Sequence, residues 1–301
     1  MLDLHSPPRT VSWFAESIQI HRDNFGPYTG SASGRGFLLA GGGPYEAGNY
    51  VAASMLGTRS RLPIVLLRRA DEPLRAGLFE ELGVQVITLA PEISASWPNG
   101  WPIKSYALTT GILPFSDVHF VDSDVVPWGD PEKAFEAENG AWACTNYHEA
   151  IQWDKYGLKP AGFPIDGGVW RLDCKRHWNV AWLYDWLNRH AARVSYQYGV
   201  GDQDQLRAAM AACGVEPTLG GTTRHQGPGF IHDAGYTHRY ADKFRTRGGH
   251  RLGHWPWPQK HTGIPGEKEA YGYFKEYWKL SAKVAPVQLD SSQKTGIIAG
   301  T

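Results

Sequence analysis

The chain has 301 residues, of which 42% are hydrophobic and 20% are charged, as in ordinary globular proteins of one or two domains. Thirty Lys and Arg residues balance thirty Asp and Glu residues, so no net charge draws the whole chain to nucleic acid or to a membrane surface. The three cysteines form no CxxC pair, which predicts a reducing compartment. The sequence shows neither an apolar leader nor a membrane-spanning stretch, and we therefore expect a cytoplasmic protein.

The first half of the chain alternates between apolar, strand-like runs and amphipathic, helix-like segments. The helix-like segments are about a dozen residues long, and several end near a glycine. Because strands separated by such helices form βαβ units, the pattern predicts a Rossmann-like, mostly parallel sheet. Strands are expected at residues 36–43, 62–69, 84–90 and 117–126, and helices at residues 11–21, 45–57, 72–83 and 103–113.

The second half of the chain is less regular. Strands are expected at residues 140–148 and 166–173, and helices at residues 176–193 and 201–214. The first of these helices carries Trp178, Trp182 and Trp186 at a spacing of four, and this stripe is expected to face the core. From residue 222 onward the sequence is rich in Gly, Pro, His and Arg, which favours one domain with a loop-rich C-terminal part.

Two carboxylates, Asp122 and Asp124, end the apolar run at residues 118–121. Ligands of open α/β sheets bind at the carboxyl ends of the strands, which is where this pair is expected. Two like charges beside a buried strand are costly unless a cation lies between them. Their position therefore favours a hard divalent ion, Mg²⁺ or Mn²⁺, that completes its coordination with substrate phosphates.

The chain contains a second acidic triplet, with Asp202 and Asp204, for which helix capping and an exposed helix face are the simpler roles. A histidine could complete the first site, because neutral imidazole binds metals beside carboxylates. His232, at the end of the apolar piece in "GPGFIH", is the first candidate, with His238 and His225 as rivals. A structural histidine is the commoner role for any one of them.

Glycines follow the first expected strand in "AGGGPYEAG" and precede a helix. Such glycines suggest contact with a phosphate or nucleotide, because backbone N–H groups and the helix dipole favour anions. The spacing is neither G-x-G-x-x-G nor a P-loop, so a dinucleotide oxidoreductase and a P-loop kinase are both unsupported.

The ordered set of motifs resembles glycosyltransferases of the GT-A fold, over roughly residues 36–240. The segments are "WPIKSYALTTGILPFSDVHFVDSDVVPWGDPEKAF", "DGGVWRLD", "GDQDQL" and "IHDAG". They resemble family 8, which includes glycogenin and bacterial galactosyltransferases, and the fungal mannosyltransferases that elongate mannan. The resemblance implies a mostly parallel sheet flanked by helices and a hexosyltransferase that uses a UDP-sugar or GDP-sugar with Mn²⁺ or Mg²⁺.

The resemblance also implies residue roles and, from the related families, retention of anomeric configuration. Asp166 replaces the usual asparagine, and the "KPW" end of the family 8 histidine motif is missing. The implied metal ligands are Asp122, Asp124 and His232; the implied nucleotide and donor contacts are Gly41, Gly42, Tyr45, Lys104, Asp122, Gly167 and Gly168; and the implied catalytic residues, beside the reacting sugar, are Asp202, Gln203 and Asp166. An inverting enzyme would need a carboxylate base, a role for which Asp166 is available.

Three segments are expected: an N-terminal helical extension (1–34), a GT-A domain (35–262) and a C-terminal helix and tail (263–301). Within the domain, residues 35–130 form the nucleotide-binding half and residues 131–262 the acceptor and donor-sugar half. Residues 224–261 carry seven Lys or Arg residues and two Asp residues. This basic segment fits a lid over phosphates, a contact with an anionic acceptor, or a solvated surface.

Two other functions stay open. A sugar-nucleotide nucleotidyltransferase shares this architecture, but it typically opens with a glycine-rich loop that carries Arg and Lys, which "GGGPYEAG" lacks. An inert nucleotide- or glycan-binding protein on the same scaffold is the other alternative. The acceptor, whether glycan, lipid, protein or modified nucleobase, and the oligomeric state do not follow from the sequence.

Overall fold

The computed structural model describes residues 31–94, 103–145, 165–191, 203–222, 235–238, 266–287 and 297–298, together with residues 16, 18–20, 28, 30, 153, 157 and 158. Residues 16 and 18–20 are helical, as expected for the segment 11–21. The other strand and helix segments expected from the sequence each contain an element of the expected type.

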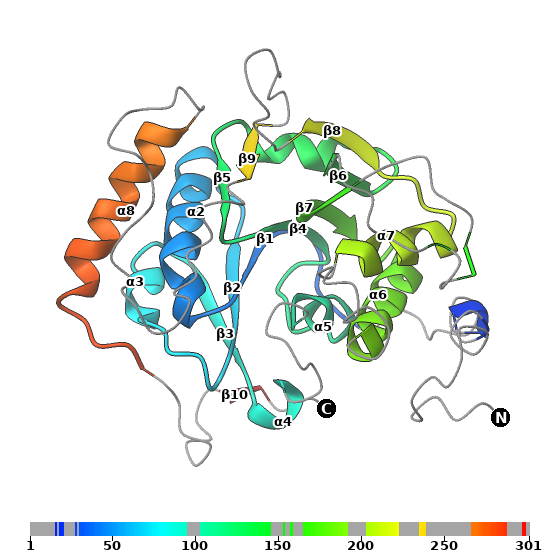
Figure 1. The fold of residues 1–301 in the computed structure, drawn as a ribbon, viewed down its shortest axis with the longest axis horizontal. Coiled ribbons are helices and arrows are strands. Elements are labelled where there is room, and N and C mark those ends of the chain that lie inside the picture. The colour runs from blue at the N-terminus through cyan, green and yellow to red at the C-terminus, as the bar shows by residue number, and fades with distance from the viewer. Residues whose placement is uncertain are drawn as a thin grey trace.

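An eight-stranded sheet forms the centre of the molecule, in the order β10-β3-β2-β1-β4-β7-β6-β8 (Figure 1). Neighbouring strands are parallel except at β7, which runs antiparallel to both β4 and β6. The predicted fold class is thus confirmed, and the chain has a GT-A-like α/β fold. The strands are β1 (Arg35–Ala40), β2 (Ile64–Arg69), β3 (Gln85–Leu89), β4 (Asp117–Val121), β6 (Ala141–Thr145), β7 (Ile165–Asp173), β8 (Thr218–Thr222) and β10 (Ile297–Ile298).

Helices cover both faces of the sheet (Figure 1). Strand alternation directs neighbouring residues into different cores: Leu38 packs in the cluster that includes α5, α6 and α7, whereas Phe37 packs in the cluster that includes α2, α3 and α8. The helices are α2 (Glu46–Arg59), α3 (Ala76–Glu80), α4 (Pro91–Ser94), α5 (Ile103–Thr109), α6 (Trp178–Ala191), α7 (Gln203–Ala212) and α8 (Glu267–Ser281), with 3-10 helices η1 (Gly43–Tyr45) and η2 (Pro131–Glu136).

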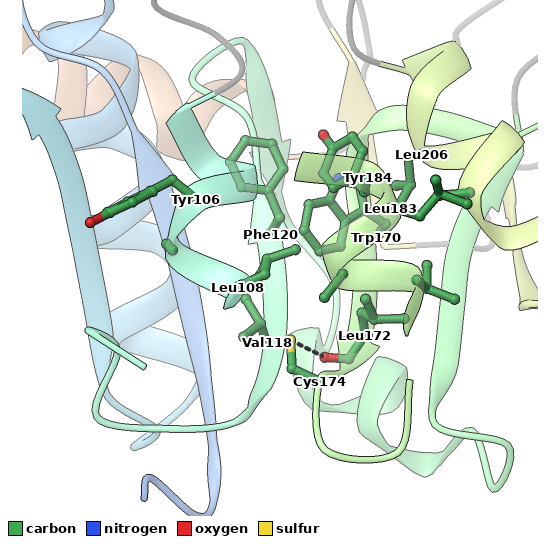
Figure 2. Packing of buried hydrophobic residues seen from close by; sticks show 14 of the residues in the cluster. Tyr106, Leu108, Val118, Phe120, Trp170, Leu172, Cys174, Leu183, Tyr184 and Leu206 are labelled. Atoms are coloured by element: carbon green, nitrogen blue, oxygen red, sulfur yellow. Dashed lines mark hydrogen bonds between the residues drawn. The ribbon is translucent and has the colours of Figure 1, made fainter. Parts of the chain in front are cut away.

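The first of these cores lies beneath the carboxyl end of β4. Phe120 of β4 stacks on Trp170 of β7, with ring centroids 5.3 Å apart, and Tyr184 of α6 meets the indole edge-on. Figure 2 shows these rings together with Val118, Leu172 and Leu206. The packing joins β4, β7, α6 and α7 into one unit, and the residues that follow β4 are held against the beginning of β7.

A second, two-stranded sheet pairs β5 (Val125–Pro127) with β9 (Tyr236–His238) in antiparallel orientation. Three residues separate it from the end of β4, and it attaches a distant part of the chain to the edge of the central sheet. None of the described helices combines the length and the apolar character that crossing a bilayer requires. All three cysteines are free thiols, as expected.

The helix expected at residues 72–83 is shorter than the sequence predicts, and α3 covers only residues 76–80. The residues before it are used in tertiary contacts: Glu72 accepts hydrogen bonds through its side chain, the carbonyl of Pro73 accepts from Gly43, and Leu74 pairs with Val287. These contacts require an extended backbone, which local helix propensity does not reveal.

Candidate active site

Asp122 and Asp124 lie where the sequence predicts them, in a tight turn between β4 and β5. The backbone N–H of Val125 donates to the carbonyl of Asp122 at 3.0 Å, and the N–H of Ser123 donates to Asp122 Oδ1 at 2.8 Å. Asp124 is 6% exposed, and Asp122 is half-buried. Because β1 and β4 are parallel neighbours, the glycines that follow β1 and the aspartates that follow β4 lie along the same edge of the sheet.

The beginning of β7 lies directly beside this turn. The backbone N–H of Asp122 donates to the carbonyl of Gly168 at 2.8 Å. Asp166 is fully buried, and its Oδ1 accepts from the N–H of Gly168 at 2.9 Å. This contact orders the loop that enters β7, and it assigns Asp166 an orienting contact with its own backbone.

Gly167 of β7 contacts two further elements, α5 and α7, and a residue of its own strand. We call this set the Gly167 junction: Gly167, Lys104, Trp170 and Gln203. The carbonyl of Gly167 accepts from Lys104 Nζ at 3.3 Å and from Trp170 Nε1 at 3.1 Å. The N–H of Gly167 donates to Gln203 Oε1 at 3.2 Å. A side chain at position 167 would place its Cβ only 2.7 Å from the Cβ of Gln203, so the close approach of α7 requires glycine.

Lys104 brings a positive charge to the junction from the first turn of α5. Its side chain is buried, and the ammonium lies 3.9 Å from the centre of the Phe120 ring. The aromatic face and the carbonyl of Gly167 together compensate a charge that burial would otherwise penalise. The sequence-predicted residues Lys104, Asp122, Gly167, Gly168 and Gln203 are thus brought together by direct contacts.

The glycine loop after β1 differs in one respect from the expectation of phosphate contact through backbone N–H groups. Residue 44 is a proline, and the other four N–H groups of the segment 41–45 already donate within the protein. Gly41 donates to the carbonyl of Leu67, Gly42 to the Glu72 carboxylate, Gly43 to the carbonyl of Pro73, and Tyr45 to the carbonyl of Gly42. The loop therefore does not cradle an anion with its amides. Lining of a nucleotide by Gly41, Gly42 and Tyr45 stays a prediction.

Two residues that the sequence did not single out hold this loop. Asn49 Nδ2 donates to the carbonyls of Ala40 and Gly41, at 3.0 and 2.7 Å. Glu72 Oε2 accepts from the N–H groups of Gly42 and Arg69, at 3.0 and 3.2 Å. Burial raises the pKa of Glu72, although the two N–H donors act in the opposite direction. The one available signal was Asn49, a polar residue within the apolar run at residues 47–53 of α2.

The metal site expected from the sequence falls only partly within the described residues. His232 and Asp202 lie outside the described residues, and the described ones contain no group of three His, Cys, Asp or Glu side chains placed to hold a metal ion. Asp122 and Asp124 do fit one part of such a site, because they supply hard oxygen donors within one turn at the sheet edge.

Asp204 was expected on an exposed helix face, and this prediction is wrong. The residue is buried in α7, because α7 packs into the core.

The ladder β5–β9 closes the other side of the aspartate turn. His238 stands opposite Val125, and Tyr236 stands opposite Pro127. The Tyr236 hydroxyl lies 3.2 Å from Nε2 of His119, a fully buried residue of β4. Burial, assisted by the charge of Arg171, lowers the pKa of His119 to about 3, so the imidazole is neutral and structural. The basic segment 224–261 lies outside the described residues apart from 235–238.

No protein-family model and no curated protein matches the chain. Among solved structures, it resembles the apo-form glycosyltransferase GlyE of Streptococcus pneumoniae TIGR4, with 15% identity and a TM-score of 0.49 over 86% of this chain and 66% of that chain. A second GlyE structure gives 15% identity and a TM-score of 0.47, over 87% and 66%. Core-mannan synthase A of Aspergillus fumigatus, in its Mn/GDP form, gives 8% identity and a TM-score of 0.35, over 71% and 84%. The chain spans just under two thirds of the GlyE structures.

Proposed function

We propose that this protein is a metal-dependent glycosyltransferase that moves a hexose from a UDP-sugar or GDP-sugar to an acceptor. One observation carries the proposal: the Gly167 junction joins three of the segments singled out by motif, around Lys104, Gly167 and Gln203. The hydrogen bond between Asp122 and Gly168 adds the acidic pair, which belongs to the same segment as Lys104. These three segments meet at the carboxyl end of β4, where ligands of open α/β sheets bind.

Each residue of this edge has a proposed role. Lys104 places its positive charge close to where a leaving nucleoside diphosphate accumulates negative charge, and the contacts with Phe120 and Gly167 hold that charge in advance. Asp122 and Asp124 would hold Mn²⁺ or Mg²⁺ together with diphosphate oxygens, and the bound ion would neutralise the leaving group. Gly41, Gly42 and Tyr45 would line the nucleotide.

Retention of anomeric configuration is part of the proposal. Gln203 is a neutral residue fixed by the N–H of Gly167, and the Asp166 carboxylate is fully buried against its own loop. Inversion would require an accessible carboxylate base. Gln203 is not a carboxylate, and the Asp166 carboxylate is not accessible, so neither residue fits that role. We assign Gln203 and Asp202 to the surroundings of the reacting sugar and Asp166 to the orientation of the Gly167–Gly168 loop.

Calorimetric titration with UDP and GDP, with and without Mn²⁺, tests the proposal. One nucleotide should bind with micromolar affinity in the presence of Mn²⁺, and Asp124→Ala should weaken this binding at least about tenfold. Glu80→Ala, which removes an exposed carboxylate from α3, is the matched control and should bind as the wild type does. A folded wild type that binds neither nucleotide would contradict the proposal.

Activity is then measured as release of UDP or GDP from a panel of nucleotide-hexoses. The anomeric configuration of the hexose product, followed by proton NMR before mutarotation, distinguishes retention from inversion. Turnover of a sugar phosphate and a nucleoside triphosphate to a nucleotide-sugar would instead identify a nucleotidyltransferase. Tight nucleotide binding without any turnover would identify a binding protein.

A further inference from the structure

The glycine loop after β1 is held in its conformation by the segment 72–75, which follows β2. The N–H of Gly42 donates to Glu72 Oε2 at 3.0 Å, and the N–H of Gly43 donates to the carbonyl of Pro73 at 2.7 Å. Gly43 has a φ of 53°, a conformation that glycine adopts freely but exchanges easily for others. The loop therefore depends on these two contacts, and not on its own sequence, for a single conformation.

The other side of the segment 72–75 contacts residues that follow α8. Leu74 and Val287 form a β-bridge in which each N–H donates to the carbonyl of the other residue, at 3.2 and 2.9 Å. Arg68 strengthens this bridge, because its Nη1 donates to the carbonyls of both Glu72 and Val287, at 2.8 and 2.9 Å. Arg68 is buried, and a buried charge requires such acceptors. The residue that binds Gly42 is thus connected to the chain beyond α8.

α8 lies beside α2 (Figure 1), and Arg75 connects the end of one helix with the start of the other. Arg75 Nε donates to the carbonyls of Ser281 and Val284, at 3.2 and 2.7 Å. Its Nη1 donates to Glu46 Oε2 at 3.1 Å, and its backbone N–H donates to Glu46 Oε1 at 3.1 Å. Glu46 directly follows Tyr45, the last residue of the glycine loop. The loop is therefore connected to the chain beyond α8 near both of its ends.

We propose that the segment 281–287 determines nucleotide affinity by holding the glycine loop in its binding conformation, with Arg68, Glu72 and Arg75 as positioning residues. This role rests on the proposed function, because it takes the nucleotide to bind against this loop. A loop that is ordered in advance does not have to be ordered by the nucleotide, so the nucleotide binds more tightly. Because the contacts act on the loop, their loss raises Kd and KM and leaves kcat nearly unchanged.

Calorimetric titration with UDP or GDP in the presence of Mn²⁺ tests this role on the two arginines that end β2. Arg68→Met removes the donors to Glu72 and Val287, and it should raise the nucleotide Kd at least about fivefold, as is typical of coupling between separate sites. Arg69→Met is the matched control, because it removes only a surface ion pair with Asp71, and its Kd should stay within about twofold of wild type. A merely stabilising role of Arg68 would lower the binding-competent fraction and leave the Kd of the folded protein unchanged.

Variants at Glu72 and Val287 test the two ends of the same connection. Glu72→Met removes the acceptor for Gly42 and should raise the Kd at least about fivefold, whereas Glu72→Gln keeps an acceptor oxygen and should recover most of the affinity. Val287→Pro removes the N–H that donates to Leu74, and it should raise the KM for a nucleotide-hexose at least about threefold, with kcat within about twofold of wild type. Wild-type affinity in folded Arg68→Met and Val287→Pro proteins would overturn this role and leave the proposed function intact.

Hydrogen exchange of the wild type keeps the test decisive if these variants do not fold. Because coupling between two sites is reciprocal, a bound nucleotide should slow exchange of the Leu74 and Val287 amides. The amide of Gly140, which donates to Ala137 before β6, reports general stabilisation, and exchange at the bridge should slow about fivefold more than exchange at Gly140. Equal slowing at all three amides would overturn the role of the segment. A folded wild type that binds neither UDP nor GDP would overturn the proposed function, and this role with it.

Discussion

The ammonium of Lys104 donates to the carbonyl of Gly167 at 3.3 Å, although 63 residues separate them in the chain. The contact fixes the first turn of α5 against the loop that enters β7. It also determines the position of a buried positive charge at the edge where the donor diphosphate is proposed to bind.

Lys104→Met is expected to lower kcat/KM for the nucleotide-sugar by about 100-fold. Methionine retains most of the apolar stem, but it removes the charge and the donor to Gly167, and one well-placed donor contributes about 10²–10³ in rate. Nucleotide release under steady-state conditions measures the effect. Lys175→Met, at an exposed position, should retain wild-type activity, and equal activity of the two variants would contradict the role of Lys104.

Gly167→Ala is expected to lower both the free energy of unfolding, by about 1–3 kcal/mol, and the activity. The new methyl group would lie 2.7 Å from the Cβ and 3.0 Å from the Cα of Gln203, so the first turn of α7 has to shift. Urea unfolding measures the loss. Gly57→Ala is the control, because nothing lies within 4 Å of its Cβ in α2, and it should gain about 0.5–1 kcal/mol. A Gly167→Ala protein as stable and active as the wild type would refute the tight approach of α7.

Gly235→Ala is expected to destabilise the protein more than Gly214→Ala does. Both glycines have positive φ, 74° and 65°, so both substitutions carry a backbone cost of about 1–2 kcal/mol. Only at Gly235 does the new Cβ meet another backbone, 3.0 Å from the Cα of Gly129, whereas Gly214 faces open space. The difference in the free energy of unfolding between the two variants therefore isolates the contact between β5 and β9. Equal losses would show that this contact contributes nothing.

The stability of the protein is expected to fall between pH 7 and pH 5 because of His119. Its pKa is about 3 in the folded state and about 6.5 when unfolded, so the unfolded chain binds the proton first as the pH falls. The contribution of His119 is complete above pH 6.5 and decreases by about 2 kcal/mol between pH 7 and pH 5. Urea unfolding at both pH values should show this decrease in the wild type.

His119→Phe should reduce the pH-dependent loss by about the same 2 kcal/mol, because the other titrating groups are common to both proteins. The variant also loses the contact with the Tyr236 hydroxyl, which lowers its stability at all pH values. An unchanged difference between pH 7 and pH 5 in His119→Phe would show that His119 is not the group responsible.

Local pattern was sufficient for the type and order of the elements that it predicted, but it did not indicate β8, β9 or β10. The apolar runs and the helical spacing placed every strand of the βαβ series, and the acidic pair at the end of one run marked the sheet edge. Local pattern was weaker for helix faces. Of the three tryptophans expected in the core, only Trp186 is buried, and Trp178 and Trp182 are half-buried. Leu183, Tyr184 and Leu187 form the buried stripe of α6 instead, because its orientation depends on α5 and α7.

The sequence by itself determined the α/β class, the strands and the candidate aspartates, because hydrophobic periodicity and turn residues act over a few neighbouring positions. Only the tertiary structure decided which segments meet: β7 beside β4, Lys104 and Gln203 at Gly167, Glu72 on the glycine loop, and β9 beside β5. Strand pairing and register are set by contacts between residues far apart in the chain, and a strand's own sequence specifies which side is apolar but not which strand it joins.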